Sequence, residues 1–125
     1  MWREAFHLAD QGVTTMEDID TAISQGPGLR WALMGPFMNL HLLGGDGGIA
    51  HLLAHLGVPI ESWWKDLGAP SMTEALQRQV TEGVAQALGD RQASDLVRAR
   101  DALLIELLRA KQASGLLSKP DDLHT

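Results

Sequence analysis

The 125-residue sequence has no cysteine, no tyrosine and no apolar run of about 18 residues. Without cysteine there can be no disulfides, thiolate nucleophiles or cysteine-type zinc sites. Without a long apolar run we expect no membrane span, and the early charges Arg3 and Glu4 predict no signal peptide. The net charge of −6 argues against nucleic acid or an anionic membrane as the main partner. We therefore expect an ordinary globular protein, cytoplasmic by default.

Tryptophan is the most frequent aromatic residue of the sequence. The sequence has two phenylalanines but four tryptophans, at positions 2, 31, 63 and 64. Tryptophan favours places where its ring is covered and its N–H is satisfied, which include interfaces and ligand pockets. The tryptophans therefore favour a surface shared with a ligand or partner.

Apolar residues recur at helical spacing along almost the whole chain, and no stretch alternates as a strand would. The sequence predicts an all-α fold of about six or seven helices over residues 1–115. Residues 116–125 are polar and predict a frayed tail. The first helix, residues 2–11, should end at Gly12, and the last should span about residues 92–113.

Glycine and proline predict the breaks between the middle helices. Residues 25–29 should form a loop, and Pro36 should open the next helix or kink it. In residues 48–57 the apolar positions Ile49, Leu52, Leu53 and Leu56 should face inward. Pro59 should then form a turn into a separate helix.

Two capping boxes predict helix starts at residues 14–17 and 71–74. Acidic residues 17, 18 and 20 then follow at a helix N-terminus, where they complement the helix dipole and need no catalytic explanation.

Several polar groups could carry chemistry, and each has a simpler explanation. His51 and His55 share a helix face, with His41 nearby, but a zinc-protease helix would carry a glutamate between its two histidines. We therefore expect no metal site. Glu4, His7 and Asp10 could transfer protons, but a solvated, ion-paired face is the expected reading. The glycine-rich run 44–48 lacks the lysine of a phosphate-binding loop and follows a helix instead of a strand.

Arg30 and Trp31 form the better candidate for a binding site. An arginine fork recognises carboxylate or phosphate, and an indole face accepts an apolar or cationic group. The two breaks on either side would hold them on a rigid bend. The alternative is that Arg30 pairs with a nearby aspartate while Trp31 packs in the core.

Five marks occur together in this sequence: a Glu4-Ala5 helix ending at Gly12, Asp18-Ile19-Asp20, Gly28-Leu29-Arg30-Trp31, Met34-Gly35-Pro36-Phe37, and the run from His41 to Gly48. In this combination residues 2–113 resemble the C-terminal helical domain of the 3-hydroxyacyl-CoA dehydrogenase family. Within this family, the motif residues most resemble those of the small-acid branch, which includes L-carnitine dehydrogenase, L-gulonate 3-dehydrogenase and lambda-crystallin. The resemblance implies a helical domain like the C-terminal domain of 6-phosphogluconate dehydrogenase.

The resemblance also implies what this domain does not supply. The family's enzymes bind NAD and carry their catalytic His–Glu pair in a preceding Rossmann domain, with an Asn-Arg pair just upstream of the helix that opens here. None of these motifs is in the sequence, so we assign no catalytic and no cofactor-binding residue. The chain is expected to be a substrate-binding and dimerisation domain, separated from a longer enzyme and inactive in hydride transfer alone.

By the same resemblance, residues 28–41 would face the cleft between the domains. Arg30, Trp31, Phe37 and His41 would then contact a small hydroxy acid or an acyl-CoA, although Phe37 fits the core equally well. The leucine stripe of the last helix would form a homodimer. The apolar face of residues 2–9 would have packed on the Rossmann domain.

Two other classes of function stay open at this point. The chain could be a free-standing enzyme without a nicotinamide cofactor, a lyase or isomerase that uses His41, His51, His55 or an aspartate. It could also be a structural dimer module that binds a partner protein.

Overall fold

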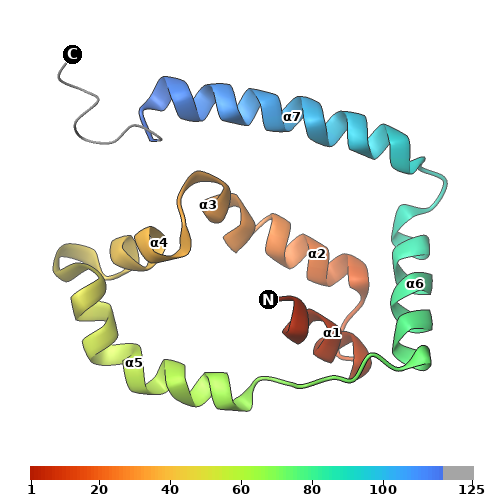
Figure 1. Ribbon diagram of the computed structural model, residues 1–125, viewed down its shortest axis with the longest axis horizontal. Helices are drawn as coiled ribbons and strands as arrows, with labels where there is room; N and C mark the ends of the chain where they lie inside the picture. Colours follow the sequence, from red (N-terminus) through yellow and green to blue (C-terminus); the bar gives the residue numbers. More distant parts are fainter. Residues whose placement is uncertain (117–125) are drawn as a thin grey trace. The chain divides into compact units, whose positions relative to one another are not determined.

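A computed structural model describes residues 1–116, which form seven α-helices and one 3₁₀ turn and contain no strand (Figure 1). The elements are α1 Trp2–Asp10, α2 Met16–Ser24, α3 Pro27–Leu33, α4 Pro36–Leu43, η1 Gly45–Gly47, α5 Gly48–Asp66, α6 Glu74–Leu88 and α7 Ala93–Ser114. The predicted all-α class and helix number are therefore confirmed. The predicted tail lies outside the described residues except for Leu116.

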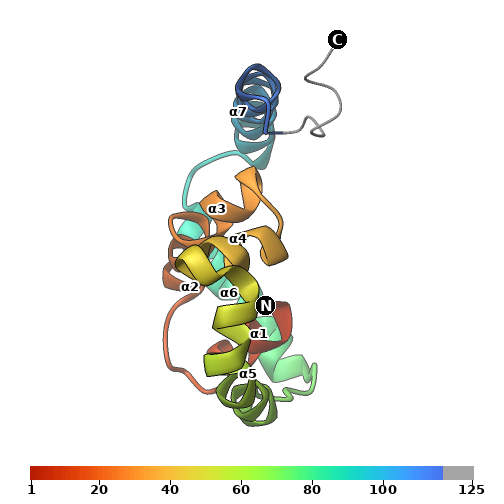
Figure 2. The same cartoon turned by 90° about the vertical axis from the view of Figure 1, so that its left-hand side faces the viewer.

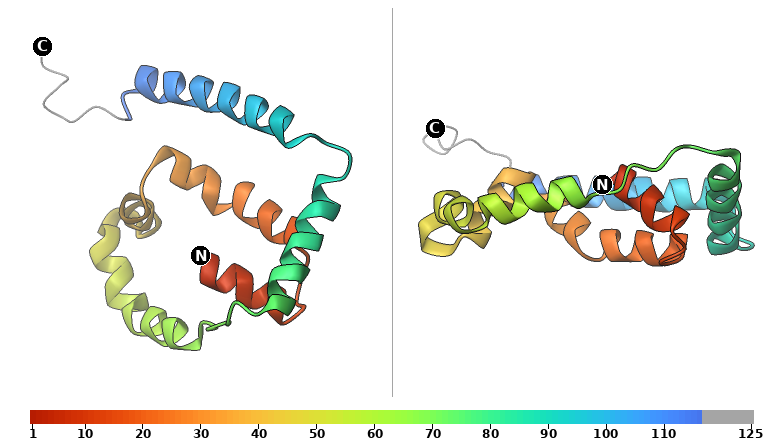
Figure 3. Two further views of the ribbon diagram at one scale, coloured as in Figure 1. Left: turned by 45° about the vertical axis from the view of Figure 1, so that its right-hand side comes forward. Right: turned by 90° about the horizontal axis from the view of Figure 1, so that it is seen from below.

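The chain divides into two units, residues 1–87 and 88–125. In the first unit α4 packs against α5, and α2 packs against α3. Residues of α1, α2 and α6 line a common pocket, and Figure 3 shows these helices beside one another. Among the described residues, the buried apolar side chains are Ala9, Leu52 and Leu76.

The described part of the second unit consists mainly of α7, a helix of 22 residues that can be followed as a separate element in Figure 2. It has no buried residue, and its leucines lie largely open to solvent. Within residues 1–116, no helix combines the length and apolar character that crossing a bilayer requires.

Two prolines lie within helices where the sequence predicted a loop or a turn. Residues 27–29 are helical instead of a loop, because Pro27 occupies the first position of α3, where its missing N–H has no helical partner to lose. Pro59 does not separate two helices but lies inside α5. Its fixed φ suits a helix, so the disruption is limited to one hydrogen bond and crowding at the carbonyl of residue 55. The start of α5 packs on α4, which favours continuation of the helix.

The inward face predicted for α5 is only partly correct. Leu52 is buried and Ile49 is half-buried. Leu53 and Leu56 are exposed, because neither α4 nor another described helix covers that side of α5.

Both capping boxes are displaced along the sequence. Helix α2 is capped by Thr15, whose hydroxyl oxygen accepts from the Asp18 backbone N–H at 3.1 Å. The Asp18 carboxylate accepts in return from the hydroxyls of Thr15 at 2.8 Å and Thr14 at 3.1 Å. Helix α6 is capped by Thr73, which accepts from the Leu76 backbone N–H at 3.2 Å. The caps are therefore at Thr15 and Thr73, where a threonine oxygen can reach a free N–H of the first turn.

These contacts change the acidity of Asp18. The hydroxyls of Thr15 and Thr14, with the Thr15 backbone N–H, hydrogen-bond its charged form and lower the pKa of the carboxyl below 3.8. A lowered folded-state pKa contributes stability that is present above the unfolded value and lost as pH falls through the folded value.

We expect Asp18→Asn to lower the thermal midpoint at neutral pH and to flatten its dependence on pH between about 5 and about 2. The wild-type chain should lose stability more steeply over that range because its carboxylate becomes protonated. Circular dichroism melts measure both effects. The control is Asp20→Asn, on the same helix; equal pH profiles for the two variants would contradict this account of Asp18.

Candidate functional site

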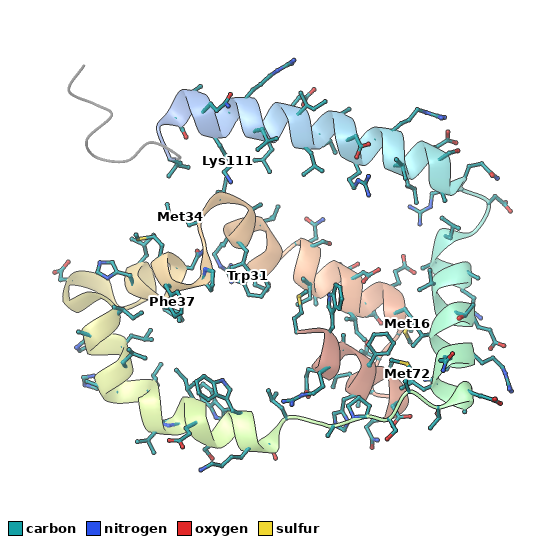
Figure 4. The ribbon with its side chains drawn as sticks, viewed as in Figure 1. Met16, Trp31, Met34, Phe37, Met72 and Lys111 are labelled. Atoms are coloured by element: carbon teal, nitrogen blue, oxygen red, sulfur yellow. The ribbon has the colours of Figure 1, made fainter. Side chains whose placement is uncertain are left out.

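Helices α3 and α4 are joined by a sharp two-residue bend. Met34 (φ −139°, ψ 150°) and Gly35 (φ −67°, ψ 170°) are extended, and Pro36 opens α4. The preceding residue of a proline is driven toward extended backbone, which places the end of α3 at this position. Figure 4 shows Trp31 on α3, Met34 at the bend and Phe37 on α4. The stretch with the candidate residues is therefore the corner between two short helices, with Pro36 opening the second as predicted.

Arg30 and Trp31 lie on the last turn of α3, and both are exposed. Trp31 is 45% exposed, so it is not a core residue among those described. Arg30 forms no ion pair with any residue from 1 to 116. The alternative expectation, a paired arginine beside a packed indole, is therefore not what these residues form. The pair instead presents a guanidinium and an indole to solvent.

Phe37 and His41 lie at opposite ends of α4. Phe37 is 75% exposed in the first turn, and so is not part of the described core. His41 Nδ1 accepts a hydrogen bond from the Ile49 backbone N–H at 3.3 Å. A ring nitrogen that accepts carries no proton, so in this tautomer the His41 proton is on Nε2. His41 thus helps to cap the start of α5, and its Nε2–H is the group that could contact a ligand.

The glycine-rich connection after α4 is shaped by close contacts. Gly48 is buried and has φ +59° with ψ −157°, a conformation almost restricted to glycine. A Cβ at Gly48 would overlap the His41 ring, and one at Gly44 would overlap the Gly48 carbonyl oxygen. These glycines allow α4 to turn into α5 over a short distance. The segment follows a helix, whereas a phosphate-binding glycine loop follows a strand.

Asn39 is a contributor to this site that the sequence did not reveal. Its Nδ2 donates to the carbonyl oxygens of Met34 at 2.8 Å, Gly35 at 3.0 Å and Arg30 at 3.4 Å. The side chain therefore reaches across the bend from α4 to the end of α3. An asparagine inside a helix has no pattern that predicts such a contact.

The other histidines form a local pair. The rings of His51 and His55 lie 4.3 Å apart at 44°, and His55 Nδ1 is 2.9 Å from the His51 carbonyl oxygen. Within residues 1–116 no group of three or more histidine, aspartate or glutamate side chains is placed to hold a metal ion.

The solvated, ion-paired face expected for α1 is wrong for Glu4 and His7. Both are half-buried. Glu4 Oε2 accepts from the Gly68 backbone N–H at 3.0 Å, and a Cβ at Gly68 would overlap the His7 ring. These side chains attach α1 to the segment after α5, because Gly68 leaves room for the ring.

A mainly apolar pocket of about 370 Å³ lies between α1, α2 and α6. It is lined by Trp2, Ala5, Phe6, Ala9, Met16, Ile19, Asp20, Val80 and Val84. A second, more polar hollow of about 510 Å³ is lined from α2, α6 and the two threonines before α2. None of Arg30, Trp31, Phe37 and His41 lines either hollow, so the bend is a separate, open site.

The two helices that meet at the bend carry a guanidinium and an indole on α3, and a phenyl ring and an imidazole on α4. Such a set can hold an anion beside an apolar or cationic group. The guanidinium and the aromatic rings are binding groups, and an imidazole can also exchange a proton.

The sequence model of the 3-hydroxyacyl-CoA dehydrogenase C-terminal domain matches residues 1–87, and the chain belongs to this family. The resemblance predicted from the five marks is thus confirmed.

The chain is similar to several L-carnitine dehydrogenases. It is 43% identical over 122 residues to that of Streptomyces coelicolor, an alignment that covers 98% of this chain and 37% of the relative. It is 46% identical over 110 residues to the Streptomyces griseus enzyme, covering 88% and 33%. For the Pseudomonas aeruginosa enzyme the identity is 44% over 110 residues, covering 88% and 34%. The chain spans about a third of the length of these relatives.

We expect Gly48→Ala to destabilise the chain by about 1–3 kcal/mol, because alanine is strained at this φ and its Cβ would displace the His41 ring. The matched change in the same helix is Gly57→Ala. Gly57 has nothing within 4 Å of its would-be Cβ, so that variant should be stabilised by up to about 1 kcal/mol.

Urea unfolding followed by circular dichroism compares the two glycine variants with the wild type. A Gly48→Ala variant as stable as Gly57→Ala would show that the α4–α5 connection is not held as described.

Proposed function

We propose that this chain is the substrate-binding and dimerisation domain of an NAD-dependent dehydrogenase of 3-hydroxyacyl-CoA or small 3-hydroxy acids, with a carnitine-like substrate. The observation that carries the substrate role is the exposed pair on α3, an arginine without an ion pair among residues 1–116 beside a tryptophan that is 45% exposed. Similarity to L-carnitine dehydrogenases over 98% of the chain supports the choice of substrate.

The chemistry of such a substrate matches the two side chains. Arg30 offers a planar fork of N–H donors, which binds a carboxylate through two charge-assisted hydrogen bonds. Trp31 offers an aromatic face, which attracts a quaternary ammonium group. A molecule with a carboxylate at one end and a trimethylammonium group at the other can engage both.

Phe37 and His41 are proposed to complete the site from α4. Phe37 is 75% exposed and adds a second aromatic surface beyond the bend. The His41 Nε2–H is a donor for the substrate's hydroxyl or carboxylate, because its Nδ1 is already bonded to Ile49.

Hydride transfer is proposed to take place elsewhere. The glycine-rich segment follows a helix, and residues 1–116 contain no strand from which a dinucleotide fold could be built. NAD would therefore be held by a separate Rossmann domain, and this chain's residues would bind and orient the hydroxy acid. The open apolar pocket on α1 is the proposed surface for that domain.

Dimerisation is proposed to use α7. No residue of this helix is buried, and Leu103, Leu104 and Leu108 are 65%, 47% and 52% exposed. A row of leucines on one face of a 22-residue helix fits the same row of a second copy.

We expect Arg30→Gln to weaken binding of L-carnitine by about ten- to a hundredfold, measured by isothermal titration calorimetry, because a charge-assisted hydrogen bond to the carboxylate is lost. Binding of choline, which lacks the carboxylate, should change little. Trp31→Leu should weaken both ligands because both carry the trimethylammonium group.

Arg109→Gln is the matched control, since it removes an exposed arginine from α7. No heat of binding from the wild type with L-carnitine or with other small 3-hydroxy acids would overturn the substrate role.

We expect the wild-type chain to be a dimer at micromolar concentration and Leu104→Arg to be a monomer, as measured by size-exclusion chromatography with light scattering. A charge on the leucine face cannot be buried in the interface without a partner. Glu106→Arg introduces the same side chain on the polar side of α7 and should remain dimeric. A wild-type monomer would contradict the dimerisation role.

A further inference from the structure

The bend between α3 and α4 is held by the only asparagine of the sequence. Asn39 Nδ2 lies 2.8 Å from the Met34 carbonyl oxygen, 3.0 Å from that of Gly35 and 3.4 Å from that of Arg30. An amide group carries two N–H donors, so the two short contacts are its main hydrogen bonds and the third is weaker.

The Met34 oxygen lies at the C-cap of α3, whereas the Gly35 oxygen also accepts the Asn39 backbone N–H at 3.1 Å, in the first turn of α4. The last turn of a helix has carbonyls without helical partners, and here the Met34 backbone N–H satisfies only that of Arg30, at 2.9 Å. Asn39 supplies one donor for the Met34 carbonyl and one for the Gly35 carbonyl. One side chain of α4 therefore determines how α3 is oriented at the corner.

Packing contributes little to this corner. Trp31, Leu33 and Phe37 are 45%, 42% and 75% exposed, and neither α3 nor α4 contains a buried residue. Where no core defines the angle between two helices, a hydrogen-bonded cross-link has the larger share in fixing it.

We propose that Asn39 is a positioning residue: it sets the direction of Arg30 and Trp31 on α3 relative to Phe37 and His41 on α4, and so assembles the anion-binding pair with the rest of the site. This inference rests on the proposed function. Asn39 acts on the substrate through the backbone of the bend and does not itself contact the ligand.

The test uses Asn39→Asp, which keeps the shape of the side chain and removes both N–H donors. The matched control is Gln77→Glu. Gln77 Nε2 donates to the Met72 carbonyl oxygen, five residues earlier, at 3.1 Å, which is the same kind of contact outside the site. Both changes replace an amide with a carboxylate in the first turns of a helix; Asn39 is half-buried and Gln77 is exposed.

The first readout is the indole N–H resonance of Trp31 in the free protein, identified by its loss in Trp31→Phe. Asn39→Asp should shift this resonance, and Gln77→Glu should leave it in place. The second readout is the affinity for L-carnitine by titration calorimetry, which should fall about tenfold in Asn39→Asp and stay within about twofold in Gln77→Glu.

A third readout does not depend on a variant folding. Labelling with ¹⁵N-asparagine gives a single side-chain NH₂ pair, because the chain has one asparagine. L-carnitine should shift that pair in the wild type, since binding at Arg30 and Trp31 reaches the carbonyls that Asn39 holds.

The outcomes separate the two proposals. If the wild type binds L-carnitine, and Asn39→Asp binds equally well with an unmoved Trp31 resonance, Asn39 is only a stabilising contact and this inference is overturned. The inference is also overturned if the wild type binds and its asparagine NH₂ pair does not move. A wild type that fails to bind L-carnitine and other 3-hydroxy acids overturns the proposed function, and with it the positioning role.

Discussion

Helices α1 to α6 are held together with very little buried apolar surface, and this constraint explains why their junctions are polar. The fully buried apolar side chains among the described residues are Ala9, Leu52 and Leu76. A small core leaves angles between short helices poorly fixed. Hydrogen bonds from side chains to backbone groups fix these angles instead: Asn39 bonds between α3 and α4, and His41 bonds between α4 and α5. The bonds to the Met34 carbonyl and the Ile49 N–H satisfy backbone groups at helix ends.

The candidate site is one result of that arrangement. Because α3 and α4 are short and bend sharply, their aromatic and cationic side chains have no core to enter. They remain on the surface, where Arg30 and Trp31 can meet a ligand. The α1 pocket and the leucines of α7 are likewise open, and they are the surfaces on which the proposed protein contacts depend.

The sequence predicted the class of fold, the order of the helices and the position of the bend, because these depend on helical spacing and on glycine and proline. The sequence prediction was wrong where one local motif is compatible with two structures. Pro59 can end a helix or lie within it, and Thr14 and Thr15 are both able to cap. It also missed contacts between distant segments, such as Glu4 with Gly68, which no local pattern encodes. The four candidate site residues were predicted from motifs, whereas the contacts of Asn39 could be recognised only in the structure.

The attachment of α1 has a consequence for how the chain reaches this structure. Glu4 contacts Gly68 across 64 positions, and Gln79 Nε2 donates to the Ala9 carbonyl oxygen across 70 positions. The bonds made by Asn39 and His41 span at most nine. Short loops close with a smaller loss of entropy than long ones, so the corner and the α4–α5 connection can form during synthesis, well before α6 has emerged. The contacts of α1 with Gly68 and Gln79 can form only after α5 and the first turns of α6 have been made.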